Sequence, residues 1–460
     1  MRVKQWLVLL LVLCCAAVLF AGGKQEQTEV AVDEGKPYAG VTIRVIAEQQ
    51  NPTLAMQKQI PKFEELTGIK VDLEMGPMDN VVSKEVLALE SRSGAYDIIS
   101  TPYQFLGQFV VNDYLQSIDP FLDNEDLRLE NFDRNDLIAG MVSASGEWKG
   151  VNYGIPSNTC IMLMFYRKDF FDNADEQTAF KAKYGYALEP AVNWEQYRDM
   201  AEFFTRKAGA TLAGEVLKTD SYGVSIAGKR HDAMTCEWLN YAWSFGGGIF
   251  NESGELIMDS ARNVEALEYF KEMAKFSPPG VSNNTWDELT TQMQQGIVAM
   301  QIQWNDCAPS VEDPSASKVA GMVGYAAIPQ GKAPAAHYGA WTYFIPKDAP
   351  NPEAAWLFLQ WVNTYEVQKA IALEGGFPVL TSVFEDPDLS KKLPYWQGSL
   401  AAYKISSKRP RIPEWNTMNN EMMLELSKVI AGEQTAAQAL GNLQSKYKDL
   451  LKGQLPITYQ

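Results

Sequence analysis

Short apolar runs alternate with longer amphipathic segments in the region that follows residue 40. The pattern predicts strands at residues 41–46, 70–74 and 96–100, separated by helices at residues 53–67 and 80–90. Strands that alternate with helices at this spacing indicate parallel βαβ units. We therefore predict an α/β fold for this part of the chain.

Polar and aromatic side chains follow two of these predicted strands. Glu48 and Gln49 come after the first strand, and Tyr103 and Gln104 come after the third. In open α/β sheets, ligands bind beyond the carboxyl ends of the strands. We therefore expect these four side chains to line a crevice.

A second polar cluster follows the apolar run at residues 297–303, which has the pattern of a buried strand and comes after a polar helix ended by Gly296. The run is followed directly by Trp304, Asn305 and Asp306. An indole ring can cover the apolar face of a sugar while the amide and carboxylate bind its hydroxyls. A core tryptophan at a strand end is the alternative interpretation.

The remainder of the chain continues the mixed pattern. A hairpin is predicted at residues 147–156, and strands are predicted at residues 161–166, 221–226, 323–327 and 340–345. Asn193 is the predicted N-cap of one helix, and further helices are predicted at residues 235–245, 263–276, 352–364, 366–374, 417–431 and 435–451.

The N-terminus has the pattern of an export signal. Two basic residues precede an apolar stretch at residues 6–20, and small residues follow it, so residues 1–23 are predicted to be a signal peptide. Residues 24–40 are polar and acidic and are predicted to form a disordered tether. We predict an exported, periplasmic protein; Cys14 and Cys15 leave a lipid anchor open.

Composition narrows the possible partners and cofactors. The 460 residues suggest two domains, and a net charge of -17 without a basic patch argues against binding to nucleic acid or anionic lipid. With two histidines and no metal-type cysteine spacing, no metal and no other cofactor is predicted. Outside the predicted signal, Cys160, Cys236 and Cys307 lie in apolar or aromatic surroundings, so buried thiols are expected, although one disulfide is possible.

Catalytic motifs are weak. Residues 223–227 nearly form a nucleophile elbow, but the final glycine is missing and no histidine follows at a suitable position. The chain has 57 acidic residues, yet no pair lies in a recognisable hydrolase motif. We predict a binding protein rather than an enzyme, and a secreted glycoside hydrolase is the weaker alternative.

Ten motifs in a fixed order resemble one known family. They are FEELTGIKV, YDIIS, WKGVNYGIPSN with LMFYRKDFF, VNWEQY, GIVAMQIQW, IPQG, HYGAWTYFIP, NPEAAWLFLQWV, GGFPV and AGEQTAAQAL. Together they resemble the sugar-binding group of the extracellular solute-binding proteins, family 1, of ABC importers, over residues 41–451. RPRIPEW and SNTCIMLMFYRKD further resemble members that carry polyols or sugars.

This resemblance implies a two-lobed periplasmic-binding-protein-like fold of class II, with the ligand between the lobes and chain crossings near residues 156–158, 304–307 and 346–352. The N-terminal lobe would comprise residues 41–156 and 306–350, and the C-terminal lobe residues 157–305 and 351–460. The implied function is capture of a sugar or polyol by hinge closure and delivery to the transmembrane subunits of an ABC permease. A monomer is expected; a non-sugar solute is the alternative.

Positions carried over from the family complete the predicted site. The resemblance implies ligand contacts from Glu48, Gln49, Tyr103, Gln104, Asn158, Trp243, Trp304, Asn305, Asp306, Trp341, Phe377 and Trp415. The chain departs from the family pattern in two places. It lacks a lipobox, and it has Thr101-Pro102-Tyr103 where many relatives carry an acidic residue.

Overall fold

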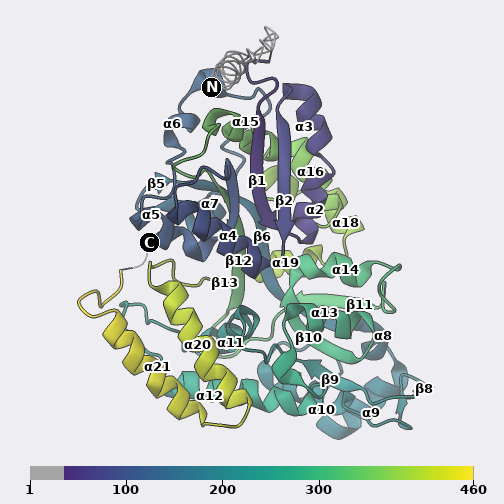
Figure 1. The fold of residues 1–460 in the computed structure, drawn as a ribbon. Helices are drawn as coiled ribbons and strands as arrows, with labels where there is room; N and C mark the ends of the chain where they lie inside the picture. The colour runs from purple at the N-terminus through teal and green to yellow at the C-terminus, as the bar shows by residue number, and fades with distance from the viewer. Residues whose placement is uncertain (1–35, 459–460) are drawn as a thin grey trace, which may run out of the picture.

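The computed structural model describes residues 36–458, which form an upper and a lower part joined at the middle of the molecule (Figure 1). The predicted signal peptide and most of the predicted tether lie outside the described residues. Residues 36–40, predicted to be disordered, instead form a turn in which the Gly40 amide donates to the Gly68 carbonyl at 2.9 Å. Among the described residues, no helix is both long and apolar enough to cross a bilayer.

The strands are β1 (Thr42–Glu48), β2 (Lys70–Gly76), β3 (Ile98–Pro102), β4 (Glu147–Trp148), β5 (Val151–Asn152), β6 (Gly154–Arg167), β7 (Thr211–Leu212), β8 (Glu215–Val216), β9 (Tyr222–Ser225), β10 (Val298–Trp304), β11 (Val323–Ala327), β12 (Ala336–Phe344) and β13 (Ser406–Ser407). The α-helices are α2 (Asn51–Gln57), α3 (Ile60–Thr67), α4 (Met78–Glu90), α5 (Leu106–Val111), α6 (Asp119–Leu122), α7 (Ala139–Ser145), α8 (Lys168–Phe171), α9 (Ala174–Tyr184), α10 (Trp194–Phe204), α11 (Asp232–Ser244), α12 (Ala261–Met273), α13 (Trp286–Gln294), α14 (Ala308–Glu312), α15 (Pro352–Val362), α16 (Tyr365–Leu373), α17 (Thr381–Phe384), α18 (Pro387–Lys392), α19 (Trp396–Tyr403), α20 (Trp415–Ile430) and α21 (Ala436–Leu450). Short 3-10 turns are η1 (Tyr103–Phe105), η2 (Glu125–Leu127), η3 (Ala274–Phe276), η4 (Val281–Asn283) and η5 (Asn305–Cys307).

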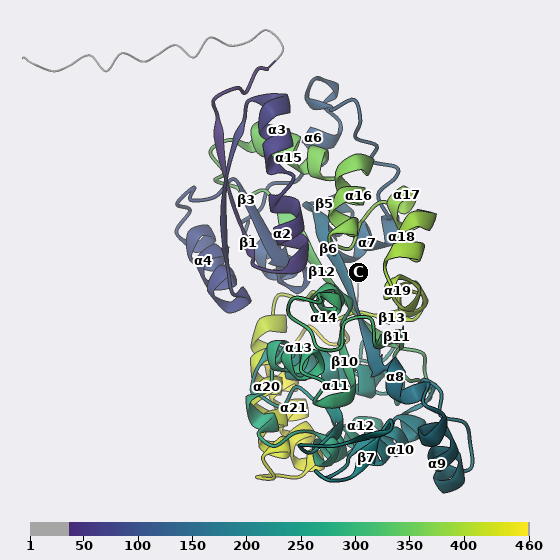
Figure 2. The ribbon, with the colours of Figure 1, turned by 90° about the vertical axis from the view of Figure 1, so that its right-hand side faces the viewer.

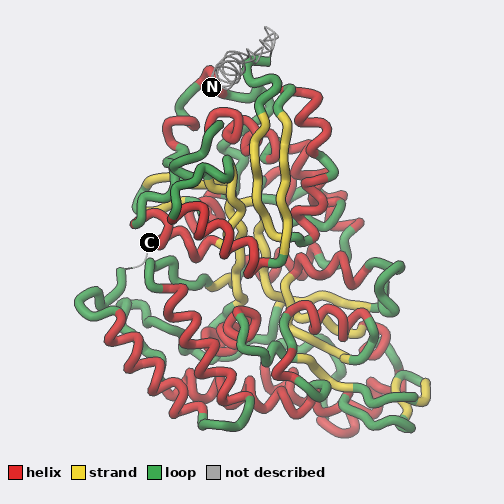
Figure 3. Tube along the Cα trace, viewed as in Figure 1, coloured by secondary structure: helices red, strands yellow, loops and turns green. Residues whose placement is uncertain are grey.

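One sheet runs through both parts, with helices on its outer faces (Figures 2 and 3). Its order is β2-β1-β3-β12-β6-β10-β9, with β11 also paired to β6 and β13 to β12. β1 is parallel to β2 and to β3, which confirms the predicted βαβ units at the start of the fold. The carboxyl ends of β1 and β3 therefore lie at the same edge of the sheet.

Strand β6 connects the two parts. Its first half is antiparallel to β12, where Gly154 lies opposite Phe344 and Ile161 opposite Tyr338. Its second half is antiparallel to β10 and β11. The sequence predicted only residues 161–166 as a strand, because Pro156 and Ser157 weaken the local strand pattern. Pairing along both edges extends the strand across the middle of the molecule.

A proline also changes one predicted helix. Residues 53–67 were expected to form a single helix, but the structure divides the segment into α2 and α3. Pro61 lies in the first turn of α3. A proline cannot donate the backbone hydrogen bond of a helix interior, whereas the first turn tolerates it.

The packing of hydrophobic cores bears on the predicted lobe boundaries. Helices α15 and α16 pack with β1 and α3 in one buried cluster, although residues 351–460 were assigned to the C-terminal lobe. β11 pairs with the second half of β6, although residues 306–350 were assigned to the N-terminal lobe. We therefore propose that α15 and α16 belong to the N-terminal lobe and β11 to the C-terminal lobe. Family motifs marked the chain crossings approximately, whereas the packing partners come from distant parts of the chain.

Candidate ligand-binding site

A cavity of about 380 Å³ lies between the two parts of the molecule. Its walls are built from strand ends of the upper part, from helix starts of the lower part and from the segments that connect them. The lining residues are Glu48, Gln49, Gln50, Asn51, Met78, Pro102, Gln104, Cys160, Asp232, Cys236, Trp286, Asp287, Thr290, Thr291, Gln294, Trp304, Asp306, Cys307, Ser310, Gly339, Ala340, Trp341 and Arg409.

The upper wall comes from the carboxyl ends of β1 and β3. Glu48 is the last residue of β1 and is half-buried, while Gln49 follows it and is exposed. Gln104 follows β3 and is only 4% exposed, and its side-chain oxygen has no hydrogen-bond partner among the described residues. This wall thus presents one carboxyl group and two side-chain amides, and the Gln104 oxygen among them lacks a partner.

The connecting wall is formed by η5, directly after β10. Asn158 on β6 donates its side-chain amide to Asp306 Oδ2 at 2.9 Å. Asn51, at the start of α2, donates to the Asp306 backbone carbonyl at 2.8 Å. Asp306 is therefore held by two segments that belong to different parts of the sequence.

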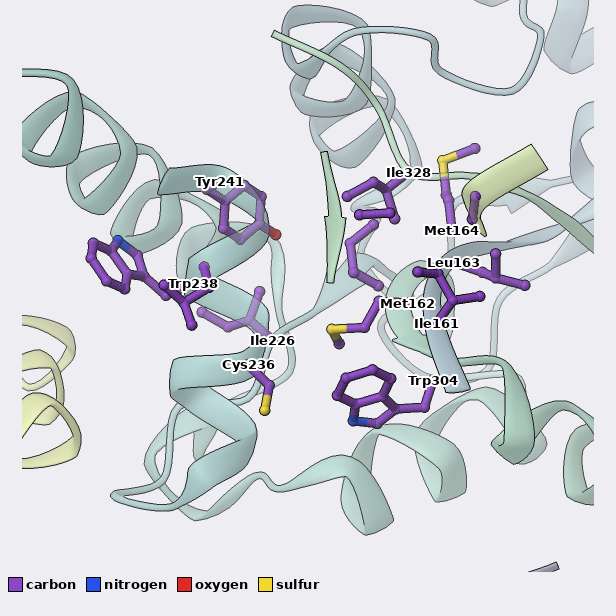
Figure 4. Packing of buried hydrophobic residues seen from close by; sticks show 14 of the residues in the cluster. Ile161, Met162, Leu163, Met164, Ile226, Cys236, Trp238, Tyr241, Trp304 and Ile328 are labelled. Carbon is purple, nitrogen blue, oxygen red and sulfur yellow. The ribbon is translucent and has the colours of Figure 1, made fainter. Parts of the chain in front are cut away.

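Trp304 belongs to the cavity wall and to the hydrophobic core at once. Its side chain lines the cavity, is 8% exposed and packs in the largest core cluster. Figure 4 shows the ring beside Met162 of β6, with Cys236 of α11 across from it. The Trp304 and His337 rings meet edge to face with centroids 5.2 Å apart. The ring therefore packs in the core and also borders the cavity, and its contact with a sugar stays a prediction.

Helix α13 forms much of the lower wall. Thr285 caps its N-terminus, and the side chains of Thr285 and Glu288 form a reciprocal capping box that fixes the first turn. Trp286 and Asp287 in this turn face the cavity, followed by Thr290, Thr291 and Gln294 along the helix. Helix α11 adds its first residue, Asp232, and Cys236 one turn later.

Asp232 forms an ion pair with Arg409. The Arg409 guanidinium donates to the two carboxylate oxygens at 2.9 and 3.2 Å, and Asn419 donates to Oδ1 at 2.6 Å. Burial alone would raise the pKa of Asp232, but Arg409 and Asn419 lower it to about 2. This carboxylate is therefore charged and fully partnered.

Glu48 and Asp306 have the opposite surroundings. Burial raises the pKa of Glu48 to about 8, with further contributions from the negative charges of Asp306, Asp287 and Asp79. Burial raises the pKa of Asp306 to about 6, against the lowering effect of the hydrogen bond from Asn158. Neither carboxylate has an ion-pair partner among residues 36–458.

Six of the twelve predicted site residues line the cavity, namely Glu48, Gln49, Gln104, Trp304, Asp306 and Trp341. Two others act behind the wall. Asn158 holds Asp306, and the Asn305 side chain accepts from the Ile161 amide at 3.0 Å and donates to Ser399. The Tyr103 hydroxyl accepts from the Arg409 amide at 2.8 Å, so it supports the loop that carries Arg409.

The remaining three predicted aromatic residues lie elsewhere. Trp243 packs edge to face on His337, with ring centroids 5.0 Å apart. Phe377 is stacked on Trp396 in the core, and Trp415 is fully buried at the start of α20. Their packing accounts for their apolar character without a ligand, and their contact with a ligand remains an untested prediction.

Several lining residues were not predicted. Asp232, Trp286 and Arg409 are the most prominent of them. The sequence Thr285-Trp-Asp-Glu288 has the capping-box pattern and could have indicated a helix start beside the site. Arg409 belongs to the motif RPRIPEW, but nothing local in the sequence connects it to Asp232.

All three cysteines among the described residues border this cavity, and all are unpaired. Burial raises the pKa of each thiol well above its ordinary value. The thiols therefore stay protonated and act as small apolar side chains. Within residues 36–458, no group of histidine, cysteine and acidic side chains is arranged to hold a metal ion.

Comparisons with known proteins agree with this architecture. The family model described as bacterial extracellular solute-binding protein matches residues 47–369. A probable amino-acid ABC transporter periplasmic-binding protein of Sinorhizobium fredii is 24% identical over 448 residues, which cover 95% of this chain and 96% of the relative. The erythritol/L-threitol-binding protein of Mycolicibacterium smegmatis is 22% identical and covers 75% of this chain and 72% of its own.

A solved structure shares the fold. The ABC transporter solute-binding protein of Agrobacterium radiobacter in complex with ribitol matches with a TM-score of 0.78 at 24% identity. The match covers 90% of this chain and 100% of that chain. This similarity confirms the predicted two-lobed α/β fold, and the family match confirms that the chain is a solute-binding protein and not an enzyme.

Proposed function

We propose, since the chain belongs to the bacterial extracellular solute-binding protein family, that it captures a polyol or sugar and delivers it to the permease of an ABC importer. The observation that carries this proposal is the chemistry of the cavity between the two parts. Trp286, Trp304 and Trp341 offer aromatic surfaces, and carboxylate, amide and hydroxyl groups surround them. Such a lining matches a molecule with apolar C–H faces and many hydroxyls.

The relatives support the same class of solute. One of them is in complex with ribitol and another is an erythritol/L-threitol-binding protein, and these solutes are small linear polyols. A cavity of about 380 Å³ is large enough for a molecule of this kind.

An amino acid is less well matched, although one relative is named as a probable amino-acid transporter protein. An α-carboxylate needs a cationic partner or several free donors. Among the described residues, Arg409 is the only basic side chain on the cavity wall. It already forms an ion pair with Asp232. We therefore expect amino acids to bind poorly.

A thermal-shift panel tests the proposal. It contains ribitol, erythritol, mannitol and common sugars, with neutral amino acids as the comparison set. A ligand at a hundred times its dissociation constant should stabilise the folded state by about 2.7 kcal/mol. If polyols and sugars leave the melting temperature unchanged while an amino acid raises it, the protein binds an amino acid and the proposed solute class is wrong.

Hinge closure gives a second measurement. Both parts supply lining residues, so a bound solute that touches both should favour a more closed arrangement. Small-angle scattering should then show a smaller radius of gyration and a monomer mass. An unchanged radius at saturating ligand would contradict capture by closure.

The absence of catalysis is checked in the same samples. Solute recovered after long incubation should be chemically unchanged, because no cavity residue within 36–458 is assigned as a nucleophile, base or metal ligand for hydrolysis. Shorter saccharides in the recovered material would favour the hydrolase alternative.

A further inference from the structure

The cavity carries more negative than positive charge. Four carboxylates line it, from Glu48, Asp232, Asp287 and Asp306, against one guanidinium from Arg409. Arg409 is committed to Asp232, with which it forms an ion pair at 2.9 Å. Three acidic side chains therefore face the same space without a cationic partner on the wall.

These carboxylates act on one another. The groups facing Glu48 are Asp306 on η5, Asp287 on α13 and Asp79 on α4, and each of them raises the pKa of Glu48. The nearby groups that can carry positive charge are His231 and Lys229, which act to lower the pKa of Asp287 against the larger raising effects of burial and Glu288. Neither group is among the causes of the raised pKa of Glu48 or of Asp306. A cation placed between Glu48 and Asp306 would relieve this repulsion, whereas the hydroxyl of a polyol supplies a donor but no charge.

A separate observation indicates the same kind of group. Gln104 is 4% exposed, lines the cavity, and has a buried side-chain oxygen without a partner. An ammonium group has three donors and no acceptor, so it can serve Glu48, Asp306 and an amide oxygen together. The indole rings of Trp286, Trp304 and Trp341 border the same cavity, and indole faces attract cations.

We propose that the preferred solute is a polyol or sugar that carries a protonated amine, held by Glu48, Asp306 and Gln104 beside the tryptophan rings. This inference rests on the proposed function and refines the class of solute. The polyol part occupies the hydroxyl-binding positions, and the amine supplies the positive charge that the wall lacks.

Calorimetric titration with matched ligands tests the inference. The first pair is D-glucamine and D-sorbitol, and the second is D-glucosamine and D-glucose; within each pair, one hydroxyl is replaced by an amine. The amine should bind at least about tenfold more tightly at neutral pH. Its binding should also release protons, because a cation lowers the pKa of Glu48, so the measured enthalpy should differ between phosphate and Tris buffers.

Three variants separate the site from general electrostatics. Glu48→Gln and Asp306→Asn should each reduce the preference for the amine, and Glu48→Gln should also reduce the proton release. Asp72→Asn is the matched control for Asp306→Asn, because Asp72 is exposed on β2 and does not line the cavity, so this substitution replaces a carboxylate outside the site. The control should keep the full preference.

The outcomes are distinguishable. If sorbitol or glucose binds as tightly as the matched amine, the inference is overturned while the proposed function stands. If the Asp72→Asn variant loses the preference as strongly as Glu48→Gln, the effect is long-range attraction and the assigned position of the amine is wrong. If neither polyols nor their amines bind, the proposed function itself fails.

Discussion

Asp232 and Glu48 line the same cavity but lie in opposite electrostatic surroundings. Arg409 and Asn419 surround Asp232 and hold its pKa down to about 2, although burial would raise it. Burial and three further carboxylates raise the pKa of Glu48 to about 8. The protein itself supplies the ion-pair and hydrogen-bond partners of the Asp232 carboxylate. The carboxyl groups of Glu48 and Asp306 have no ion-pair partner among residues 36–458.

This difference separates two roles within one site. The Asp232–Arg409 pair connects α11 to the loop before α20 and belongs to the scaffold. The Glu48–Asp306 side leaves acceptors available to a solute. Substitutions on the first side should therefore affect folding most, and substitutions on the second side should affect binding and its pH dependence.

Arg409→Met should produce the largest effect on stability. Loss of one partner leaves the Asp232 carboxylate buried without its cation, which typically costs about 3–5 kcal/mol. Urea unfolding near neutral pH measures the change. The double variant Arg409→Met with Asp232→Asn should recover part of the loss, since it removes the uncompensated charge. A single-variant loss below about 1 kcal/mol would mean that the pair behaves as an exposed ion pair.

The pH dependence of the same pair has a defined sign. Because the folded pKa of Asp232 lies below its ordinary value of 3.8, the pair contributes stability above that value and loses it as the pH falls toward about 2. The wild-type protein should therefore lose stability over this acidic range, and the double variant should lose less. Parallel acid unfolding curves would contradict the assigned shift.

Trp304→Ala should reduce both stability and affinity. The indole packs in the core on one side and borders the cavity on the other, so its removal should cost about 3 kcal/mol of folding stability. Affinity for the solute should fall about tenfold or more because an aromatic wall is lost. Thermal melting and calorimetric titration measure the two effects.

Trp415→Ala is the matched control for this variant. Trp415 is fully buried and lies outside the cavity lining, so its removal should lower the melting temperature without a specific loss of affinity. Loss of affinity in the folded Trp415 variant would instead favour the predicted ligand contact of that residue.

Gly339→Ala should act through the position of Trp304. A Cβ at Gly339 would lie 2.6 Å from Cys160 Sγ and 3.0 Å from two atoms of the Trp304 ring. Relief of this crowding must displace the Cys160 thiol and shift the neighbouring Trp304 ring, at a cost of about 1–3 kcal/mol. We expect a loss of affinity of several-fold, measured by titration.

The control for this variant is Gly140→Ala in helix α7, where no atom lies within 4 Å of the added methyl group. It should bind normally. Equal affinity of the Gly339 variant and this control would show that the wall tolerates displacement of the indole.

Glu48→Gln should give the smallest effect on stability, with the opposite pH dependence from that of Asp232. Because the folded pKa of Glu48 is raised from 4.5 to about 8, its favourable contribution is present below 4.5 and is lost as the pH rises through about 8. Near pH 8 the variant should therefore have a free energy of unfolding about 1 kcal/mol greater than that of the wild type, after allowance for solvent screening. Its melting temperature should be correspondingly higher. Melting curves across this range measure the difference, which should vanish below pH 4.5.

The local sequence determined the elements that supply part of the site. The strand patterns near Glu48, Gln104 and Trp304 predicted β1, β3 and β10, and these three side chains do line the cavity. Strand periodicity depends on near neighbours in the chain, and polar residues after a buried strand emerge at the sheet edge. These features can be predicted without a tertiary structure.

The tertiary structure decided which other side chains join them. Arg409 meets Asp232 from 177 positions away, and Asn51 meets Asp306 from 255 positions away, so no local pattern encodes either contact. Trp415 and Phe377 are aromatic residues of the kind that binds sugars, and the structure packs both rings in the core. Hydrophobic burial and aromatic stacking on a ligand use the same residue types, and only the arrangement of distant segments determines which of the two a given ring serves.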